Sequence, residues 1–163
     1  MKIAVYPGSF DPVTLGHLDI VKRASMMFDT VVVTVMNNSA KSSLFSVDER
    51  VKMIREAVSE FGNVQVDSYD GLLIDYCKEK GIHIVVRGLR AITDFEYELQ
   101  IAQTNRELSH NNVDSVFLTT NLRYSYLSSS TVKEIASYGG EVSGMVPENV
   151  FKALESKYNK HLN

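Results

Sequence analysis

The sequence predicts an α/β protein in which helices cover both faces of a five-stranded parallel sheet. Short apolar runs rich in β-branched residues recur along the chain, and segments with helical spacing alternate with them. The junctions between the two carry helix-cap and turn residues. This alternation is typical of right-handed βαβ units, so we expect a doubly wound, Rossmann-like sheet.

The expected strands are short and almost uniformly apolar, as strands buried on both faces are. They cover residues 3–6, 31–36, 64–66, 82–86 and 116–118. The first two segments between them place apolar side chains every three or four residues, which predicts amphipathic helices. These positions are Leu18, Val21, Ala24 and Phe28 in one segment, and Val51, Ile54 and Val58 in the other.

Cap residues, glycines and a proline also predict where the helices begin and end. Residues 46–49 have the pattern of a capping box at the start of the second helix. Gly62 and Gly81 lie where helix ends need a positive φ. A fourth helix begins at about Asp94. Pro147 opens a last helix, about 147–158, whose apolar positions are expected to dock on the domain, and residues 159–163 are expected to fray.

Length and charge limit the classes of protein that this chain can be. Its 163 residues, 44% of them hydrophobic, fit a single domain over 1–163 and argue against disorder. The 17 Lys and Arg against 20 Asp and Glu give a net charge of -3, which excludes a broad cationic nucleic-acid surface. Any anion site is therefore expected to be local.

The cysteine content and the first residues bear on the expected location. The single Cys77 excludes an internal disulfide, has no partners at a zinc-site spacing, and is expected to lie in a helix as a core residue. The apolar start of the chain is too short for a signal h-region or a membrane span. We expect a reducing compartment, the cytoplasm.

The loop after the first strand is the most informative segment. Residues 6–17 contain neither G-x-G-x-x-G nor a P-loop Gly-Lys-Ser/Thr. They instead offer Gly8, the hydroxyl of Ser9, and His17 at the start of a helix, where free N–H groups and the helix dipole favour phosphate. The alternative is that His17 only packs or caps locally.

Cationic residues follow two other strands, at the edge of the sheet where open α/β folds bind ligands. Lys41 is the only charge in the loop 37–43; it reaches a phosphate on one interpretation and is a solvated surface lysine on the other. Arg87 and Arg90 flank Gly88 after the fourth strand, and arginines there are better explained by anion binding than by solubility.

Two further polar features have both structural and functional interpretations. Glu98 lies in the first turns of the fourth helix, where acids are expected on dipole grounds alone. Residues 124–130 form a hydroxyl cluster before the fifth helix. Capping explains one of its three consecutive serines, and a phosphate cradle explains the cluster better.

Together these motifs resemble the T-x-G-H nucleotidyltransferases and, within them, the phosphopantetheine adenylyltransferases of bacterial coenzyme A synthesis. The resemblance covers essentially the whole chain. The motifs that carry it are Y-P-G-S-F-D-P at 6–12 with T-L-G-H at 14–17, R-G-L-R-A at 87–91, D-F-E-Y-E at 94–98, and S-S-S at 128–130 with V-K-E at 132–134. T-x-G-H alone indicates only the superfamily.

The resemblance implies reversible transfer of the adenylyl group of ATP to 4'-phosphopantetheine, giving dephospho-CoA and pyrophosphate with Mg²⁺. It also implies a cytoplasmic homohexamer with coenzyme A as a feedback inhibitor, and no nucleic-acid or membrane partner. The acceptor phosphate is already an anion, so such an enzyme positions and neutralises its substrates rather than supplying a nucleophile. No protein carboxylate cage for a metal is expected.

The resemblance also implies roles for individual residues. His17 is the expected catalytic residue, a transition-state stabiliser. The ATP-binding residues are expected to be Ser9, Phe10, His17, Gly88, Leu89, Arg90, Glu98, Tyr124, Ser125, Tyr126, Leu127, Ser128, Ser129 and Ser130. The phosphopantetheine-binding residues are expected to be Ser9, Lys41, Leu73 and Arg87. The chain departs from the family at Ser9, where threonine is common, and at 109–112, which has no clear counterpart.

Two other functions stay open at this point. Another adenylyl or cytidylyl transferase on the same fold would use the same histidine with a different acceptor, such as nicotinamide mononucleotide or glycerol phosphate. A noncatalytic module that senses adenine nucleotides would keep the fold without the reaction. The acceptor pocket distinguishes the first alternative, and turnover distinguishes the second.

Overall fold

A computed structural model describes residues 1–37, 42–90 and 92–159 of the chain, and its strands confirm the expected parallel sheet. The strands are β1 (Ile3–Gly8), β2 (Thr30–Asn37), β3 (Val64–Asp70), β4 (Ile84–Leu89) and β5 (Asp114–Thr119). The helices are α1 (Leu15–Ser25), α2 (Val47–Ala57), α3 (Leu73–Lys80), α4 (Ile92–Leu108), α5 (Ser129–Ser137) and α6 (Glu148–Asn159), with a short 3-10 helix, η1 (Leu122–Tyr124).

The order of the strands creates a switch point in the middle of the sheet. The spatial order is β3-β2-β1-β4-β5, and every neighbouring pair is parallel. The chain winds outward from β1 through β2 to β3, then crosses back to β4 on the other side of β1. Open α/β sheets bind ligands beyond the carboxyl ends of the strands at such a point. The fold thus predicts a site between the ends of β1 and β4.

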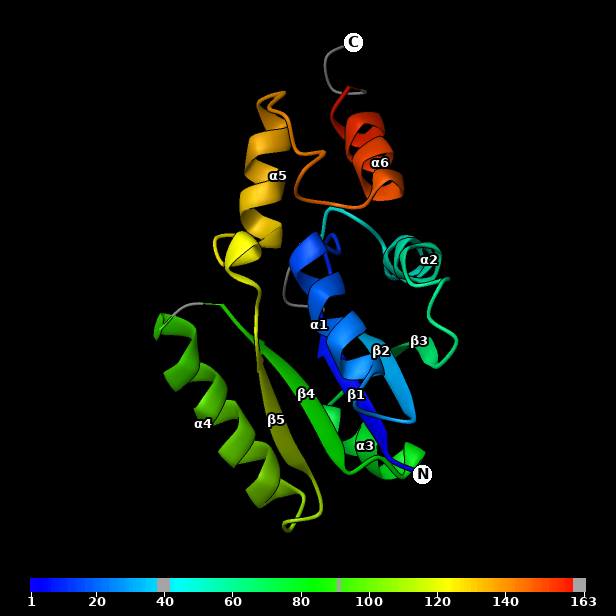
Figure 1. Cartoon of the computed structure of the whole chain (residues 1–163), viewed down its shortest axis with the longest axis vertical. Helices are drawn as coiled ribbons and strands as arrows, with labels where there is room; N and C mark the ends of the chain where they lie inside the picture. The colour runs from blue at the N-terminus through cyan, green and yellow to red at the C-terminus, as the bar shows by residue number, and fades with distance from the viewer. Residues whose placement is uncertain (38–41, 91, 160–163) are drawn as a thin grey trace.

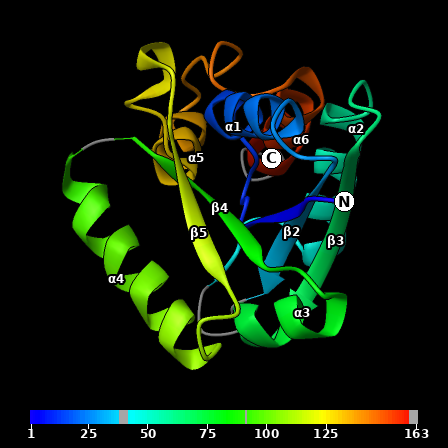
Figure 2. The same ribbon diagram turned by 60° about the horizontal axis from the view of Figure 1, so that its bottom comes forward.

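Helices cover both faces of this sheet (Figures 1 and 2). One core cluster joins α1, α2, α5 and α6 to the sheet, with Ile20, Ile54 and Leu154 nearly inaccessible to solvent. A second cluster lies on the opposite face, where Tyr76 and Cys77 of α3 pack against the sheet. Burial of Cys77 confirms its expected place in the core. Helix α4 lies along β4 and β5 (Figure 1).

The helix boundaries confirm most of the expected capping. Ser46 Oγ accepts a hydrogen bond from the Glu49 backbone N–H, and Glu49 Oε2 accepts one from Ser46 N–H at 2.7 Å, which completes the capping box. Gly81 ends α3 with φ +64. The expectation for Gly62 is wrong, because α2 ends at the cap residue Val58 in a turn and Gly62 has no positive φ.

The structure also changes two boundaries. Strand β4 continues through Arg87 and Gly88, which the sequence placed after the strand, because its ladder with β5 pairs Arg87 with Phe117. Helix α6 begins at Glu148, and the carbonyl of Pro147 accepts its first hydrogen bond from Phe151 N–H. The expected fraying covers 159–163; Asn159 is the last residue of α6, and 160–163 lie outside the described residues.

None of the helices that the structure describes is long and apolar enough to cross a membrane.

Candidate active site

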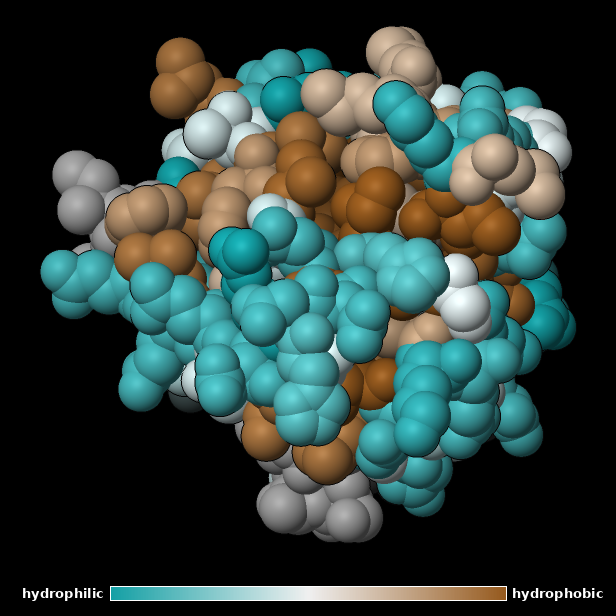
Figure 3. All heavy atoms as spheres, turned by 90° about the horizontal axis from the view of Figure 1, so that it is seen from below, coloured by the Kyte–Doolittle hydropathy of each residue, from teal (hydrophilic) through white to brown (hydrophobic). Residues whose placement is uncertain are grey.

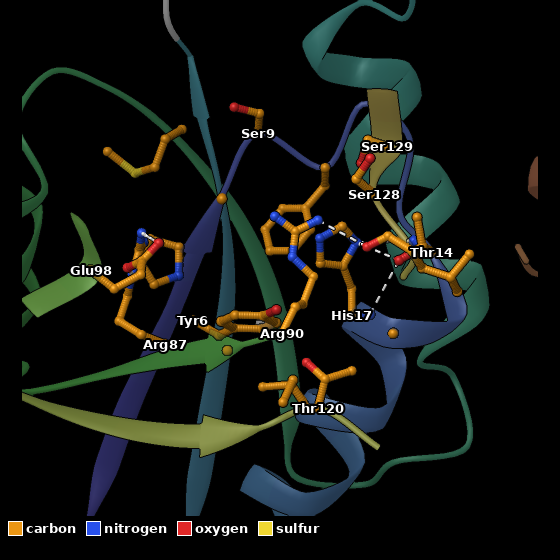
Figure 4. Close-up of a pocket in the computed structure, with 18 of the residues that line it drawn as sticks. Tyr6, Ser9, Thr14, His17, Arg87, Arg90, Glu98, Thr120, Ser128 and Ser129 are labelled. Atoms are coloured by element: carbon orange, nitrogen blue, oxygen red, sulfur yellow. Dashed lines mark hydrogen bonds and ion pairs between the residues drawn. The ribbon is translucent and has the colours of Figure 1, made fainter. Parts of the chain in front are cut away.

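A cavity of about 620 Å³ lies at the switch point, beyond the carboxyl ends of β1 and β4 (Figure 4). Its wall is built by the end of β1 and the loop after it, the first turn of α1, the end of β4, one face of α4, and the start of α5. Each segment brings polar side chains or backbone groups to one space, because the carboxyl ends of parallel strands share one edge of the sheet.

Most residues that the sequence singled out line this cavity. They are Ser9, Phe10, His17, Leu73, Arg87, Gly88, Arg90, Glu98, Leu127, Ser128, Ser129 and Ser130. The structure does not bring Leu89, Tyr124, Ser125 or Tyr126 into its lining. Tyr124 belongs to the short helix η1, and Tyr126 is exposed. Lys41 lies outside the described residues.

His17 both caps a helix and lines the cavity. The Thr14 backbone N–H donates to His17 Nδ1 at 3.0 Å, and Thr14 Oγ1 accepts from His17 N–H, so the pair closes a capping box at the start of α1. Because a backbone N–H can only donate, Nδ1 is the acceptor nitrogen and the ring hydrogen is on Nε2. The local capping interpretation and the ligand-binding one are thus compatible.

The electrostatic surroundings keep this ring neutral. Burial and, to a smaller extent, the positive charge of Arg90 together lower the pKa of His17 to about 4. At neutral pH the imidazole is therefore uncharged, with an N–H donor at Nε2. In this state the ring can donate a hydrogen bond to an anion but adds no positive charge.

The loop before His17 is folded tightly around Phe10. Phe10 has φ +46, a left-handed conformation that non-glycine residues seldom adopt. Its ring meets the His17 ring edge-on with 5.0 Å between centroids, and it packs against Tyr6 at 5.3 Å. A Cβ at Gly8 would lie 2.9 Å from Phe10 Cζ, so glycine is required for this ring to back the histidine.

The two arginines of β4 and the turn after it are held differently. Arg87 makes a bidentate pair with Glu98 of α4, with Nε to Oε2 at 2.6 Å and Nη2 to Oε1 at 2.8 Å. Arg90 donates from Nη1 to the Leu127 carbonyl at 2.9 Å, and Figure 4 shows its side chain beside His17. Burial raises the pKa of the Tyr6 phenol. The positive charges of both guanidinium groups lower this pKa, but by less than burial raises it.

The serines at the start of α5 have partly structural roles. Ser128 is the N-cap, and its Oγ accepts from Thr131 N–H at 3.0 Å. Ser129 Oγ donates to the Pro12 carbonyl at 2.8 Å, which joins α5 to the loop of Phe10. Ser128, Ser129 and Ser130 nevertheless line the cavity, which places a helix N-terminus, a favourable position for an anion, at its wall.

The sequence interpretation missed several lining residues. They are Ile20, Met36, Tyr97, Ile101, Asn105 and Thr120. Met36 and Thr120 stand at the carboxyl ends of β2 and β5, so the edge argument could have found both. Ile101 and Asn105 follow Glu98 on α4 at spacings of three and four residues, so they share its face of the helix. This periodicity could have predicted that they line the same cavity.

The cavity is suited to anions rather than to a protein-bound metal. Among the residues that the structure describes, no three His, Cys, Asp or Glu side chains gather as a metal site. The carboxylate that lines the cavity, Glu98, is engaged by Arg87.

Comparisons with known proteins agree with this architecture. The cytidylyltransferase-like family model matches residues 5–135. Phosphopantetheine adenylyltransferase of Lachnoclostridium phytofermentans is 55% identical over 159 residues, which are 98% of this chain and 97% of the relative. The enzyme of the same name from Alkaliphilus metalliredigens is 53% identical over 96% of this chain and 99% of its own.

A crystal structure from Vibrio parahaemolyticus, described as that of a nicotinate-nucleotide adenylyltransferase, has a TM-score of 0.65. The likeness covers 94% of this chain and 99% of that one at 18% identity, and it shows the shared fold alone. The resemblance stated from the motifs is confirmed by the two curated relatives, which match nearly end to end. The chain therefore belongs to the phosphopantetheine adenylyltransferases, within the cytidylyltransferase-like family.

Proposed function

We propose that this protein transfers the adenylyl group of ATP reversibly to 4'-phosphopantetheine, giving dephospho-CoA and pyrophosphate in coenzyme A biosynthesis. The observation that carries the proposal is the convergence of two arginines, a neutral histidine and a serine-rich helix start on one cavity. Relatives at 49–55% identity over nearly the whole chain bear the name of this activity.

The first task of such a site is to hold two anions together. An oxygen of the acceptor phosphate attacks the α-phosphorus of ATP. Because this phosphate is already an anion at neutral pH, the protein need not deprotonate it. Positioning and neutralisation are then the main sources of acceleration. Arg87 and Arg90 supply local positive charge in a chain whose net charge is -3.

The geometry supports a division of the cavity between the two substrates. In Figure 4 Arg87 and Glu98 lie at one side, Ser128 and Ser129 at the other, and Arg90 and His17 between them. The phosphates of ATP would lie against the start of α5 and Arg90. By resemblance Gly88 and Glu98 also bind the nucleotide, and because Glu98 pairs with Arg87, its carboxylate would lie where the two substrates meet. Phosphopantetheine would reach Arg87 and Leu73, and by resemblance Lys41.

His17 is assigned to the transition state in this arrangement. As charge spreads over the oxygens of the α-phosphate, the Nε2–H group can strengthen its hydrogen bond to them. Thr14 fixes Nδ1 as the acceptor, so the donor needs no rearrangement during the reaction. Ser9, one residue from Phe10, would contact both substrates from the same loop.

Mg²⁺ is proposed to enter as part of the MgATP substrate. The described lining offers cations, hydroxyls and one arginine-bound carboxylate, so the phosphates and water would be its main ligands. When bound, the ion would neutralise charge on the phosphates.

We also propose a cytoplasmic homohexamer whose active site is open to feedback by coenzyme A. Phe95 and Leu108 of α4 and Val116 of β5 are exposed apolar side chains suited to an interface. Figure 3 shows apolar side chains gathered in a band beside a hydrophilic area on one face of the molecule. The buried free thiol of Cys77 is compatible with a reducing compartment.

An acceptor panel tests the proposed function. Purified protein with ATP and Mg²⁺ is offered phosphopantetheine or nicotinamide mononucleotide, and pyrophosphate release is measured. We expect release with phosphopantetheine and none with the mononucleotide. Turnover of the mononucleotide alone would show that the protein catalyses adenylyl transfer to a different acceptor.

A variant of His17 separates an enzyme from a nucleotide sensor. His17→Ala should lower kcat by orders of magnitude, while the dissociation constant for ATP changes much less, because the residue acts mainly in the transition state. Equal losses in kcat and in ATP affinity, or no turnover by the parent protein, would favour the sensor.

A further inference from the structure

Asp11 lies behind the cavity wall and gathers three donors from distant parts of the chain. The residue is 6% exposed and does not line the cavity. Its Oδ1 accepts from Phe45 N–H at 2.9 Å, and its Oδ2 accepts from Leu44 N–H at 2.9 Å and from Lys133 Nζ at 2.8 Å. One carboxylate therefore joins the loop after β1, the segment before α2, and α5.

These bonds keep the carboxylate ionised in a buried place. Burial by itself raises the pKa of Asp11, but the hydrogen bonds from Lys133, Leu44 and Phe45 outweigh it and lower the pKa overall. A buried charge with this many partners is costly to disturb, because removing it leaves buried donors without an acceptor.

The loop that Asp11 anchors needs to be held. Phe10, its immediate neighbour, has the left-handed φ of +46, a conformation that costs free energy and persists only where the surroundings enforce it. On the other side of Phe10, Arg50 of α2 donates from Nη1 to the Ser9 carbonyl at 2.8 Å. The strained residue thus lies between two anchored neighbours, and its ring backs the His17 imidazole.

We propose that Asp11 is a positioning residue for adenylyl transfer: by tying the Ser9–Phe10 loop to α5 and to residues 44–45, it holds the His17 ring at the cavity. The inference rests on the proposed function. Asp11 touches neither substrate in this account and acts through Phe10 and His17. A displacement of about 1 Å in such a site can lower the rate about 100-fold.

Asp11→Asn tests this role with little change in volume. An amide keeps one acceptor oxygen, but its NH2 group would face either the Phe45 N–H or the Leu44 N–H and the Lys133 ammonium together, and all of these are donors. We expect kcat to fall about 10-fold to 100-fold, with the KM values for ATP and phosphopantetheine changed by less than about threefold. Lys133→Met keeps both backbone bonds, so its loss in kcat should be smaller than that of Asp11→Asn.

Asp67→Asn is the matched control. Asp67 also pairs with a lysine, Lys80 at 3.1 Å, and accepts from Tyr76 Oη at 3.0 Å, but it belongs to β3 away from the cavity. Its replacement should lower the melting temperature without changing kcat. A folded Asp11→Asn protein with kcat within threefold of the parent, or an equal kcat loss in Asp67→Asn, would overturn the positioning role.

The ¹⁵N resonances of the His17 ring give a readout that needs no turnover. Asp11→Asn should shift them, and Lys133→Met should shift them less, whereas Asp67→Asn should leave them in place. If Asp11→Asn leaves the His17 resonances unchanged, the positioning role is overturned, whatever the reaction proves to be. If Asp11→Asn does not fold, the same two measurements on Lys133→Met decide, and an unchanged kcat with unchanged resonances overturns the role. Lack of turnover by the parent protein would instead contradict the proposed function.

Discussion

At the residue scale, one backbone hydrogen bond determines what His17 can do. The Thr14 N–H occupies Nδ1, so Nε2 carries the hydrogen, and burial together with Arg90 keeps the ring neutral. A neutral donor suits a reaction whose nucleophile is already ionised. Arg87 is likewise constrained, because the bidentate pair with Glu98 fixes the plane of its guanidinium group.

The neutral state of His17 makes a prediction about pH. The free protein should show a His17 titration midpoint near 4, against about 6.5 for an ordinary histidine, by NMR of the imidazole. Because the unfolded chain takes up this proton at a higher pH than the folded one, His17 should reduce stability as pH falls from about 6.5 to about 4. A midpoint near 6.5 would contradict the capped, buried tautomer.

The two arginines should be separable by substrate. Arg87→Ala is expected chiefly to raise the KM for phosphopantetheine, since Arg87 lies at the side of the cavity assigned to the acceptor. Arg90→Ala should chiefly weaken ATP binding, because its guanidinium lies beside His17 and the start of α5. Steady-state kinetics with each substrate varied checks this. Identical changes for both substrates would show that the division is wrong.

At the element scale, the sequence predicts strands and caps better than their exact ends. All five strands and the Ser46 capping box follow from apolar runs and cap residues. The end of β4 could not be predicted from hydropathy, because its ladder to β5 continues through Arg87 after the apolar run has stopped. The prediction of a positive φ at Gly62 was wrong because a glycine indicates a positive φ only where the helix actually ends, and α2 ends earlier, at Val58.

The candidate site was predictable where its residues follow strands, and less so elsewhere. The edge rule places His17, Arg87 and Arg90 together, whereas Tyr97 of α4 comes from a helix face that the rule does not cover. The position of Asp11 in its network could not be predicted either. Its partners lie 33 to 122 residues away, and only the fold brings them together.

The turn after β1 makes a prediction with a control in the same chain. Gly8→Ala should displace the Phe10 ring from His17 and lower kcat about tenfold or more, because the added Cβ would lie 2.9 Å from Phe10 Cζ. Gly62→Ala meets nothing within 4 Å and needs no positive φ, so its stability should be unchanged or slightly raised. Thermal unfolding and kcat of both variants check the contrast. Full activity of Gly8→Ala would contradict the role of the ring.

At the scale of the whole molecule, function depends on a local reversal of charge. The chain is acidic overall, yet the switch point of its sheet gathers two arginines and a helix start at one cavity. Helices α1, α2, α5 and α6 on one face and α3 and α4 on the other leave this edge of the sheet open. Under the proposed function, both substrates would occupy this cavity together and react directly.

Direct transfer within one cavity is the central claim, and the stereochemistry at the α-phosphorus tests it. ATP made chiral there by an α-thio substitution is converted with phosphopantetheine, and the configuration of the product is determined. We predict inversion, because the acceptor oxygen attacks in line as pyrophosphate leaves, in a single step. Retention would reveal a covalent adenylyl-enzyme and contradict the claim that His17 and its neighbours only position and stabilise.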